Sequence, residues 1–510
     1  MGDGTPLSVS DLEETEVADW FAGRADTVIG TACARVYLAG DQAFKVKRRV
    51  DLGYLDYSTL DLRQWALERE LRFNRAAASD IYRSVRRVTR QPAGGLEFDG
   101  SGAVVEYALE MRRFDETAVL AAQPWAVDGA LAEALGREVA ALHARAELRP
   151  QGGGAKALKF TIDSNAHLLR QMKARLGADL VDALIVATER EFQRQEPLLD
   201  ARRVGGFSRH CHADLHLGNI LLENGKPVLF DCIEFNDVLS DIDMQYDLAF
   251  LLMDLDFRRR RDAAVRVQSA YLDEAARREG DDLRSGMLCL PLMLSVRAAV
   301  RAHVQAHSGD DVAAIAYLKA ALEHLTPAAP SLTAVGGLSG TGKTTFARLI
   351  APGLGAAPGA VVLRTDEIRK RLMGVAPDAP LPDTIYSPAY YAKVYEALLD
   401  EAQSLIAAGR AVVMDATFIQ PGLRGRVEHL ARELGVAFRG VWLEAEPAIL
   451  AQRISGRADD ASDATAATLQ MQLDLDVGDI NWSKVDATGP AAESAQAWAS
   501  HHIPSQEFKC

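Results

Sequence analysis

The chain has 510 residues and a formal net charge of −14, and 48% of its residues are hydrophobic while 25% are charged. This length allows about three folding units of roughly 150 residues each, and the composition is ordinary for a soluble globular protein. The negative charge and an aromatic content of only 7% disfavour a general nucleic-acid-binding protein, because such proteins carry basic surfaces and stacking aromatic side chains.

The cysteines and the chain start indicate a reduced, cytoplasmic protein. The five cysteines are widely scattered and include no C-x-x-C pair, so neither a disulfide framework nor a zinc site is expected. Residues 1–14 are acidic and lack the apolar run of a secretory signal. The most apolar stretch, residues 287–296, is too short to span a bilayer. We therefore expect no contact with a membrane.

Residues 16–113 mix strand and helix patterns, which predicts a small sheet with one helix. The expected strands are residues 28–29, 34–38, 42–46 and 104–109, and the expected helix is residues 60–76. Lys45 and Lys47 fall on one face of a strand because side chains alternate with period two. Exposed edge strands also carry lysine, so a surface role for this pair stays open.

After residue 113 the pattern is mainly helical up to residue 325, and one polar loop interrupts it. The loop reads His212-x-Asp214-x-x-x-x-Asn219, and Asp231 then closes an apolar strand. Phosphoryl transfer to an alcohol requires a carboxylate at the acceptor hydroxyl and two oxygen ligands that hold Mg²⁺ on the triphosphate. Asp214, Asn219 and Asp231 are candidates for these three roles, in that order along the chain.

A Pro/Ala-rich linker, residues 326–331, leads into an apolar strand and a phosphate-binding motif. Residues 337–345 fit G-x-x-x-x-G-K-[ST], between a strand and a helix as the motif requires. Lys343 is expected to reach the β- and γ-phosphates and the Thr344 hydroxyl to ligate Mg²⁺, while backbone N–H groups cradle the phosphates. The nucleotide-binding candidates here are Gly337, Ser339, Gly340, Thr341, Gly342, Lys343, Thr344 and Thr345.

Beyond this motif, strands and helices alternate, which predicts a parallel sheet with helices on both faces. The expected strands are residues 361–363, 411–414 and 438–443, and the expected helices start at residue 367 and cover residues 390–408, 424–434 and 447–454. The domains are therefore predicted to be residues 1–325 and 332–510.

Five further side chains are candidates at the second site. Asp366, after a strand, is placed to orient and deprotonate an acceptor hydroxyl, although it would also serve as a helix N-cap. Arg369 is suited to clamp an anionic substrate. Asp415 ends an apolar strand, as a Mg²⁺-binding aspartate does. Arg453 and Arg457 resemble lid arginines that close on phosphates, with a solvated helix end as the alternative.

The segment from His212 to Asp231 resembles the catalytic and metal segments of the aminoglycoside phosphotransferase family, which has a two-lobed, α+β protein-kinase-like fold. The resemblance covers residues 16–325 in outline, with lobes at about 16–113 and 114–325. It implies that Asp214 is the catalytic base, that Asn219 and Asp231 bind the metal, and that His212 supports the loop.

The same resemblance assigns the nucleotide contacts of the first site. It implies that Lys45 holds the α- and β-phosphates with Glu70 as its helix partner, although Lys47 and Glu68 compete for these roles. It also places the interlobe hinge that pairs with adenine at residues 105–111, which include Met111. The sequence departs from the family near residues 30–33, where no G-x-G-x-x-G motif is found.

Residues 331–500 resemble the P-loop small-molecule kinases, including gluconate kinases, zeta-toxin-like kinases and polynucleotide kinases, which implies an α/β P-loop NTPase fold. Together the two resemblances predict a tandem phosphotransferase that uses ATP and Mg²⁺. The expected acceptor is a hydroxyl of a small sugar-like or amino-sugar-like metabolite. Two alternatives stay open: one half is a non-catalytic, nucleotide-binding regulatory module, or the C-terminal half is a polynucleotide 5′-kinase. The acceptors and the oligomeric state are not predicted.

Overall fold

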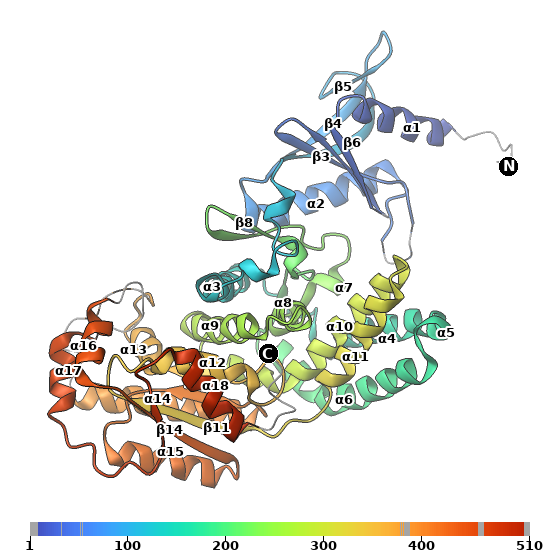
Figure 1. Ribbon diagram of the computed structural model, residues 1–510. Helices are drawn as coiled ribbons and strands as arrows, with labels where there is room; N and C mark the ends of the chain where they lie inside the picture. Colours follow the sequence, from blue (N-terminus) through green and yellow to red (C-terminus); the bar gives the residue numbers. More distant parts are fainter. Residues whose placement is uncertain are drawn as a thin grey trace. The chain divides into compact units, whose positions relative to one another are not determined.

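The structure is a computed structural model that describes residues 9–503, except residues 32, 52, 54, 378, 380, 382–387 and 457–463 (Figure 1). The chain divides into two compact units. Unit 1 comprises Met1–Gln123 and His210–Ile242, and unit 2 comprises Pro124–Arg209 and Asp243–Cys510. Strands β7 (Ser208–His210) and β10 (Asp241–Asp243) lie where the chain passes between the units.

Unit 1 is built on a six-stranded antiparallel sheet in the order β1-β2-β3-β6-β4-β5. Its strands are β1 (Thr27–Gly30), β2 (Ala34–Ala39), β3 (Gln42–Lys47), β4 (Tyr82–Arg90), β5 (Leu96–Phe98) and β6 (Val104–Arg112), with the hairpin β8 (Ile220–Glu223) and β9 (Lys226–Leu229). Its α-helices are α1 (Val9–Ala22), α2 (Leu60–Ala78) and α7 (Asp237–Ser240). The expected sheet and helix are confirmed, whereas α1, β4 and β5 were not predicted.

Helix α2 carries one face of buried residues into unit 1. Thr59 caps its first turn by accepting a hydrogen bond from the Leu62 N–H. The buried positions Leu67, Glu70 and Asn74 follow one another at a spacing of three or four residues. The face that packs against the sheet therefore includes a carboxylate and an amide.

The segment predicted as the hinge lies inside strand β6. Met111 is buried and lies opposite Ala43 of β3 and Tyr82 of β4, so its backbone belongs to the sheet. The chain leaves the sheet only after Arg112. The connecting segment therefore comes later in the chain than residues 105–111, and the contact of Met111 with adenine stays a prediction.

Unit 2 contains a five-stranded parallel sheet in the order β12-β13-β11-β14-β15, as the alternating pattern predicted. Its strands are β11 (Ser331–Gly337), β12 (Val361–Arg364), β13 (Val412–Asp415), β14 (Ala437–Glu444) and β15 (Ser483–Asp486). The helices from this sheet onward are α12 (Lys343–Ile350), α13 (Thr365–Leu372), α14 (Pro388–Ala407), α15 (Pro421–Glu433), α16 (Pro447–Ser455), α17 (Ala466–Leu473) and α18 (Ala491–His502).

The earlier part of unit 2 is helical, as expected. It comprises α3 (Gly129–Arg145), α4 (Gly154–Gln171), α5 (Lys173–Leu176), α6 (Ala178–Val204), α8 (Met244–Phe257), α9 (Arg261–Glu279), α10 (Leu290–His307) and α11 (Asp311–His324). In Figure 1 these helices are coloured teal to yellow, and the parallel sheet with its helices follows in orange and red.

Helix α9 packs against the edge strand β12 of the parallel sheet. Val265 of α9 is fully buried in the same apolar core as Val335, Phe346 and Ile350. Ser269 Oγ accepts a hydrogen bond of 3.0 Å from the Val362 N–H, which therefore does not face solvent as an open sheet edge would. The core of the region 332–510 thus includes a residue from the preceding helices, and the boundary at residues 326–331 stays a prediction.

One helical segment, Leu283–His307, is long and apolar enough to cross a membrane by length and composition. This segment is longer than residues 287–296, which the sequence analysis recognised as the most apolar stretch. Of its most apolar window, 67% is buried inside the structure, as in the core helix of a soluble protein, which passes the same test.

We expect Val265→Ala to destabilise unit 2 by about 1–3 kcal/mol, because it opens a cavity in the core of the parallel sheet. The measurement is urea unfolding followed by circular dichroism. The matched control is Val312→Ala, since Val312 is 82% exposed and its truncation should cost less than about 0.5 kcal/mol. Equal effects of the two substitutions would contradict the packing of α9 on the sheet.

Burial lowers the pKa of His324, at the end of α11, to about 4. The folded chain therefore keeps His324 neutral between about pH 6.5 and 4, while the unfolded chain binds a proton there. Stability should be full above about pH 6.5 and fall towards pH 4, by at most about 3 kcal/mol from this group. Urea midpoints at pH 7 and pH 5 should differ less in His324→Gln than in wild type. His429→Gln, at an exposed histidine, should retain the wild-type difference.

Candidate active sites

In unit 1, Lys45 lies between a buried glutamate and the predicted metal-binding aspartate. Its Nζ donates to Glu70 Oε1 at 2.6 Å and to Asp231 Oδ1 at 2.7 Å. Burial by itself would lower the pKa of Lys45, but Asp231 and Glu70 hold that pKa well above its ordinary value. The structure therefore brings together three residues that the sequence predicted for one site.

Lys47, on the same face of β3, lies deeper in a second set of partners. Its Nζ contacts Glu70 Oε2 at 2.7 Å and Glu234 Oε1 at 2.6 Å, and Glu234 Oε1 also accepts from the Tyr57 hydroxyl at 2.8 Å. The Lys47 side chain is 2% exposed, against 15% for Lys45. Burial would raise the pKa of Glu70, but the two lysines lower it to about 2. Of the two lysines, Lys45 is thus better placed to meet a nucleotide.

The loop with the predicted base is held by its own polar side chains. Asn219 Nδ2 donates to Asp214 Oδ2 at 2.8 Å and to the Asp214 carbonyl at 2.9 Å. His212 Nε2 donates to the Phe230 carbonyl at 2.9 Å, which links this loop to the strand before Asp231. Ala213 and Asp231 adopt positive φ angles of 70° and 61°, which only a few per cent of non-glycine residues adopt.

Two residues that the sequence analysis missed fix the backbone around Asp231. Tyr82 Oη accepts from the Asp231 N–H at 3.0 Å, and Asn74 Oδ1 accepts from the Cys232 N–H at 3.0 Å. Asn74 lies four residues after Glu70 on the same face of α2, so helical spacing from Glu70 could have identified it. Asn219 and Asp231 carry the amide and carboxylate oxygens that Mg²⁺ accepts as ligands, so these residues fit the metal predicted for them.

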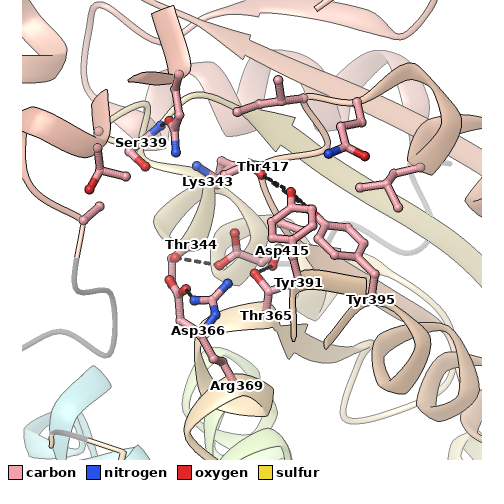
Figure 2. Close-up of a pocket in the computed structure, with 18 of the residues that line it drawn as sticks. Ser339, Lys343, Thr344, Thr365, Asp366, Arg369, Tyr391, Tyr395, Asp415 and Thr417 are labelled. Carbon is pink, nitrogen blue, oxygen red and sulfur yellow. Dashed lines mark hydrogen bonds and ion pairs between the residues drawn. The ribbon is translucent and has the colours of Figure 1, made fainter. Parts of the chain in front are cut away.

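In unit 2, the predicted phosphate loop joins β11 to α12 (Figure 2). Gly340 and Gly342 have φ angles of +87° and +84°, which place these residues in the left-handed region. A Cβ on Gly340 would lie 2.7 Å from the Leu450 carbonyl oxygen, so only glycine fits there. The loop therefore has the backbone form of a phosphate cradle, and its residues fit a nucleoside triphosphate.

The predicted Mg²⁺ ligands of unit 2 meet directly. Thr344 Oγ1 donates to Asp415 Oδ2 at 2.6 Å, and Figure 2 shows the two side chains side by side. Arg364, which was not predicted, lies beside this pair, with Nη2 3.4 Å from Thr344 Oγ1 and Nε 3.5 Å from Asp415 Oδ2. Hydroxyl and carboxylate oxygens are the ligands that Mg²⁺ prefers, so Thr344 and Asp415 fit this ion.

A cavity of about 860 Å³ extends from the phosphate loop, past Thr344 and Asp415, to Asp366 and Arg369. Arg369 Nη1 donates to Asp366 Oδ1 at 2.5 Å. Thr417 Oγ1 lies 3.1 Å from the Tyr391 hydroxyl and 3.4 Å from the Tyr395 hydroxyl, and these groups line the cavity too (Figure 2). The tyrosines, four residues apart on one helix face, were not predicted as site residues.

The remaining predicted residues of unit 2 have different positions. Ser339, Thr345 and Arg453 line the cavity, whereas Thr341 Oγ1 donates to the Leu338 carbonyl at 2.8 Å. The guanidinium of Arg453 donates to the carbonyls of Ala487 and Thr488 at 2.7 and 2.9 Å, so it does not point freely at the phosphate loop. Arg457 lies outside the described residues. Gly337 ends β11 and donates its N–H to the Thr417 carbonyl at 3.1 Å.

Family models match both parts of the chain. Residues 61–283 match the model described as "Phosphotransferase enzyme family", and residues 332–475 match the model described as "AAA domain". The uncharacterized protein Rv2004c of Mycobacterium tuberculosis is 32% identical over 485 residues, which are 91% of this chain and 93% of that protein. The chain belongs to the Rv2004c family.

Uncharacterized protein Mb2027c of Mycobacterium bovis shows the same identity and coverage. This chain thus carries a phosphotransferase-family domain followed by a P-loop kinase-like domain.

Solved structures resemble each part separately. A gluconokinase from Sinorhizobium meliloti is 23% identical and covers 35% of this chain and 97% of its own, with a TM-score of 0.25. A thermostable mutant of aminoglycoside phosphotransferase APH(4)-Ia is 13% identical and covers 61% of this chain and 98% of its own, with a TM-score of 0.37.

The two lysines of β3 should differ in their effect on stability. Lys47→Met leaves Glu234 and Glu70 buried with one fewer cation, so we expect a loss of about 3–5 kcal/mol. Lys45→Met should cost clearly less, because Glu70 keeps Lys47 and Asp231 is 44% exposed. Urea unfolding of the two variants at pH 7 checks this order. The reverse order would show that Lys45 carries the buried charge pair.

Proposed function

We propose that this chain is a cytoplasmic, bifunctional phosphotransferase with two ATP- and Mg²⁺-dependent sites. Each site would transfer the γ-phosphoryl group to a hydroxyl of a small sugar-like or amino-sugar-like metabolite. The observation that carries the proposal is the cavity of unit 2, which holds Lys343, the Thr344–Asp415 pair and the Asp366–Arg369 pair together. The described cysteines are free thiols, which agrees with a reducing compartment.

In the second site, most of the rate acceleration would come from positioning and charge neutralisation. Lys343 and the backbone N–H groups of the loop would hold the phosphates, and Thr344 with Asp415 would hold Mg²⁺. The ion neutralises phosphate charge when it is bound. Asp366 would accept the proton of the acceptor hydroxyl, and the hydrogen bond from Arg369 would orient this carboxylate.

In the first site, Asp214 would orient the acceptor hydroxyl while Asn219 and Asp231 hold Mg²⁺. Lys45 would exchange its contact with Asp231 for phosphate oxygens, while Glu70 keeps the ammonium group in place. The adenine would lie on the apolar cluster that contains Ala43, Met111 and Leu221. Ala43 lies two residues before Lys45 and hence on the same face of β3, which supports this arrangement.

A hydroxyl-rich acceptor fits the described walls of the second cavity. Tyr391, Tyr395 and Thr417 present three hydroxyl groups within hydrogen-bond distance of one another. A hydroxyl both donates and accepts, so such a cluster can pair with the hydroxyls of a sugar-like molecule. The net charge of −14 disfavours a polynucleotide acceptor.

The test is ATP consumption and product formation across a metabolite panel by Asp214→Asn, Lys343→Met and the double variant. Each single substitution should remove one class of product by at least about 100-fold, and the double variant should remove both. Lys319→Met, at an exposed lysine of α11, is the control and should match wild type.

Three other outcomes would replace the proposal. If neither single substitution changes any product, the two-site proposal is wrong. If Asp214→Asn changes no product while unit 1 binds ATP tightly, the first half is a regulatory module. If a Lys343-dependent activity phosphorylates 5′-hydroxyl oligonucleotides and no metabolite, the second half is a polynucleotide kinase.

A further inference from the structure

The outer side of the phosphate loop is covered by helices α16 and α17. Leu450 and Ile454 of α16 and Leu469 of α17 form a small buried core, and Leu338 of the loop packs against it. The backbone of Leu450 also lies so close to Gly340 that no side chain would fit between them. These two helices therefore rest directly on the loop.

Gln472 extends from α17 into this contact. It lies three residues after the buried Leu469, hence on the same side of the helix. Its Oε1 accepts a hydrogen bond of 2.8 Å from the Ser339 N–H, and both residues line the cavity. A side chain from outside the motif thus binds a backbone donor of the phosphate loop.

The ammonium group of Lys343 lies at the same part of the loop. Its Nζ donates to the Leu338 carbonyl at 3.0 Å, and Leu338 precedes Ser339. Because the lysine of this motif reaches the β- and γ-phosphates, the segment 338–339 marks the end of the cradle where the terminal phosphate binds. Gln472 lies at that end.

A carboxamide suits this position better than other polar groups. Its oxygen accepts from an N–H group while its NH₂ group offers two further donors. Gln472 can therefore keep the Ser339 N–H on Oε1 and donate from Nε2 to a phosphate oxygen. A carboxylate would repel the phosphates, and an ammonium group could not accept from Ser339.

We propose that Gln472 is a ligand of the terminal phosphate of ATP at the second site. Oε1 holds the Ser339 N–H, and Nε2 donates to an oxygen of the γ-phosphoryl group. The inference rests on the proposed ATP-dependent function of this site and adds a phosphate contact from α17, outside the motif. It follows that Gln472 distinguishes ATP from ADP, which lacks that group.

The test measures the affinities of full-length protein for ADP and for a non-hydrolysable ATP analogue, each with Mg²⁺, by calorimetry. A Lys45→Met background removes nucleotide binding at the first site. In this background Gln472→Ala should weaken binding of the analogue about 10-fold and leave ADP binding unchanged, since one hydrogen bond to a charged group is lost. Gln472→Glu should weaken binding of the analogue further.

The matched control is Gln470→Ala. Gln470 lies on the same helix but is exposed, and its amide donates to Asp474. This variant should match the background for both nucleotides. Thermal unfolding of all variants shows whether α17 remains packed.

Three results would overturn the inference. Equal weakening of ADP and analogue binding would assign Gln472 to the packing of α17, and unchanged affinities would mean that it does not touch the nucleotide. Tighter binding of both nucleotides by Gln472→Ala would mean that Gln472 competes with the nucleotide for the Ser339 N–H. If the Lys45→Met background binds neither nucleotide, the proposed second ATP site is wrong and so is this inference. If the background binds nucleotide and adding Lys343→Met abolishes this binding, the second ATP site is supported. The Gln472 variants then decide whether Gln472 binds the terminal phosphate.

Discussion

A buried carboxylate must be paired with positive charge, and Glu70 shows how much of unit 1 depends on this constraint. Its two oxygens take one lysine each, Lys45 and Lys47. Leaving this carboxylate without both lysines would cost several kcal/mol. The pairing therefore holds α2 against β3, and through Lys45 it also holds the side chain of Asp231. In unit 1, the predicted catalytic geometry and the stability of the fold rest on the same charges.

In unit 2, charged side chains are likewise paired where the helices pack against the parallel sheet. Arg371 of α13 pairs with Asp273 of α9 and with Glu401 of α14, and Arg348 of the helix after the phosphate loop pairs with Glu133 of α3. Arg364, beside Thr344 and Asp415, pairs with Glu367 at 2.9 Å, and the Glu367 side chain is 17% exposed. Arg364 thus connects the predicted Mg²⁺ ligands to Glu367 of α13.

Local motifs made much of both sites predictable. The phosphate loop and the loop from His212 to Asn219 are defined by residue types at fixed spacing, and the alternation of strands and helices gave the parallel sheet. Helix α1 and strand β4 were missed because their apolar residues follow no clear period: β4 is rich in arginine, and α1 has mixed charged and apolar positions.

Contacts between residues that are distant in the chain could not be predicted from such local motifs. Lys45 and Lys47 occupy equivalent positions on one strand face, and they are distinguished by partners far along the chain, Asp231 for Lys45 and Glu234 for Lys47. Gln472 belongs to no motif, so its contact with Ser339 depends entirely on how α17 packs. The expected hinge was placed too early because strand β6 continues to Arg112, and nothing in its alternating pattern marks where the sheet ends.

The packing of α9 on β12 also bears on how such a chain is assembled from its parts. A free P-loop domain would present β12 as an open edge, ready to pair with the edge of another molecule. Here Ser269 and Val265 cover that edge. Exchange of the second half for another kinase domain would therefore require a matching surface on α9, so recombination between members of this family is constrained to move α9 and the parallel sheet together.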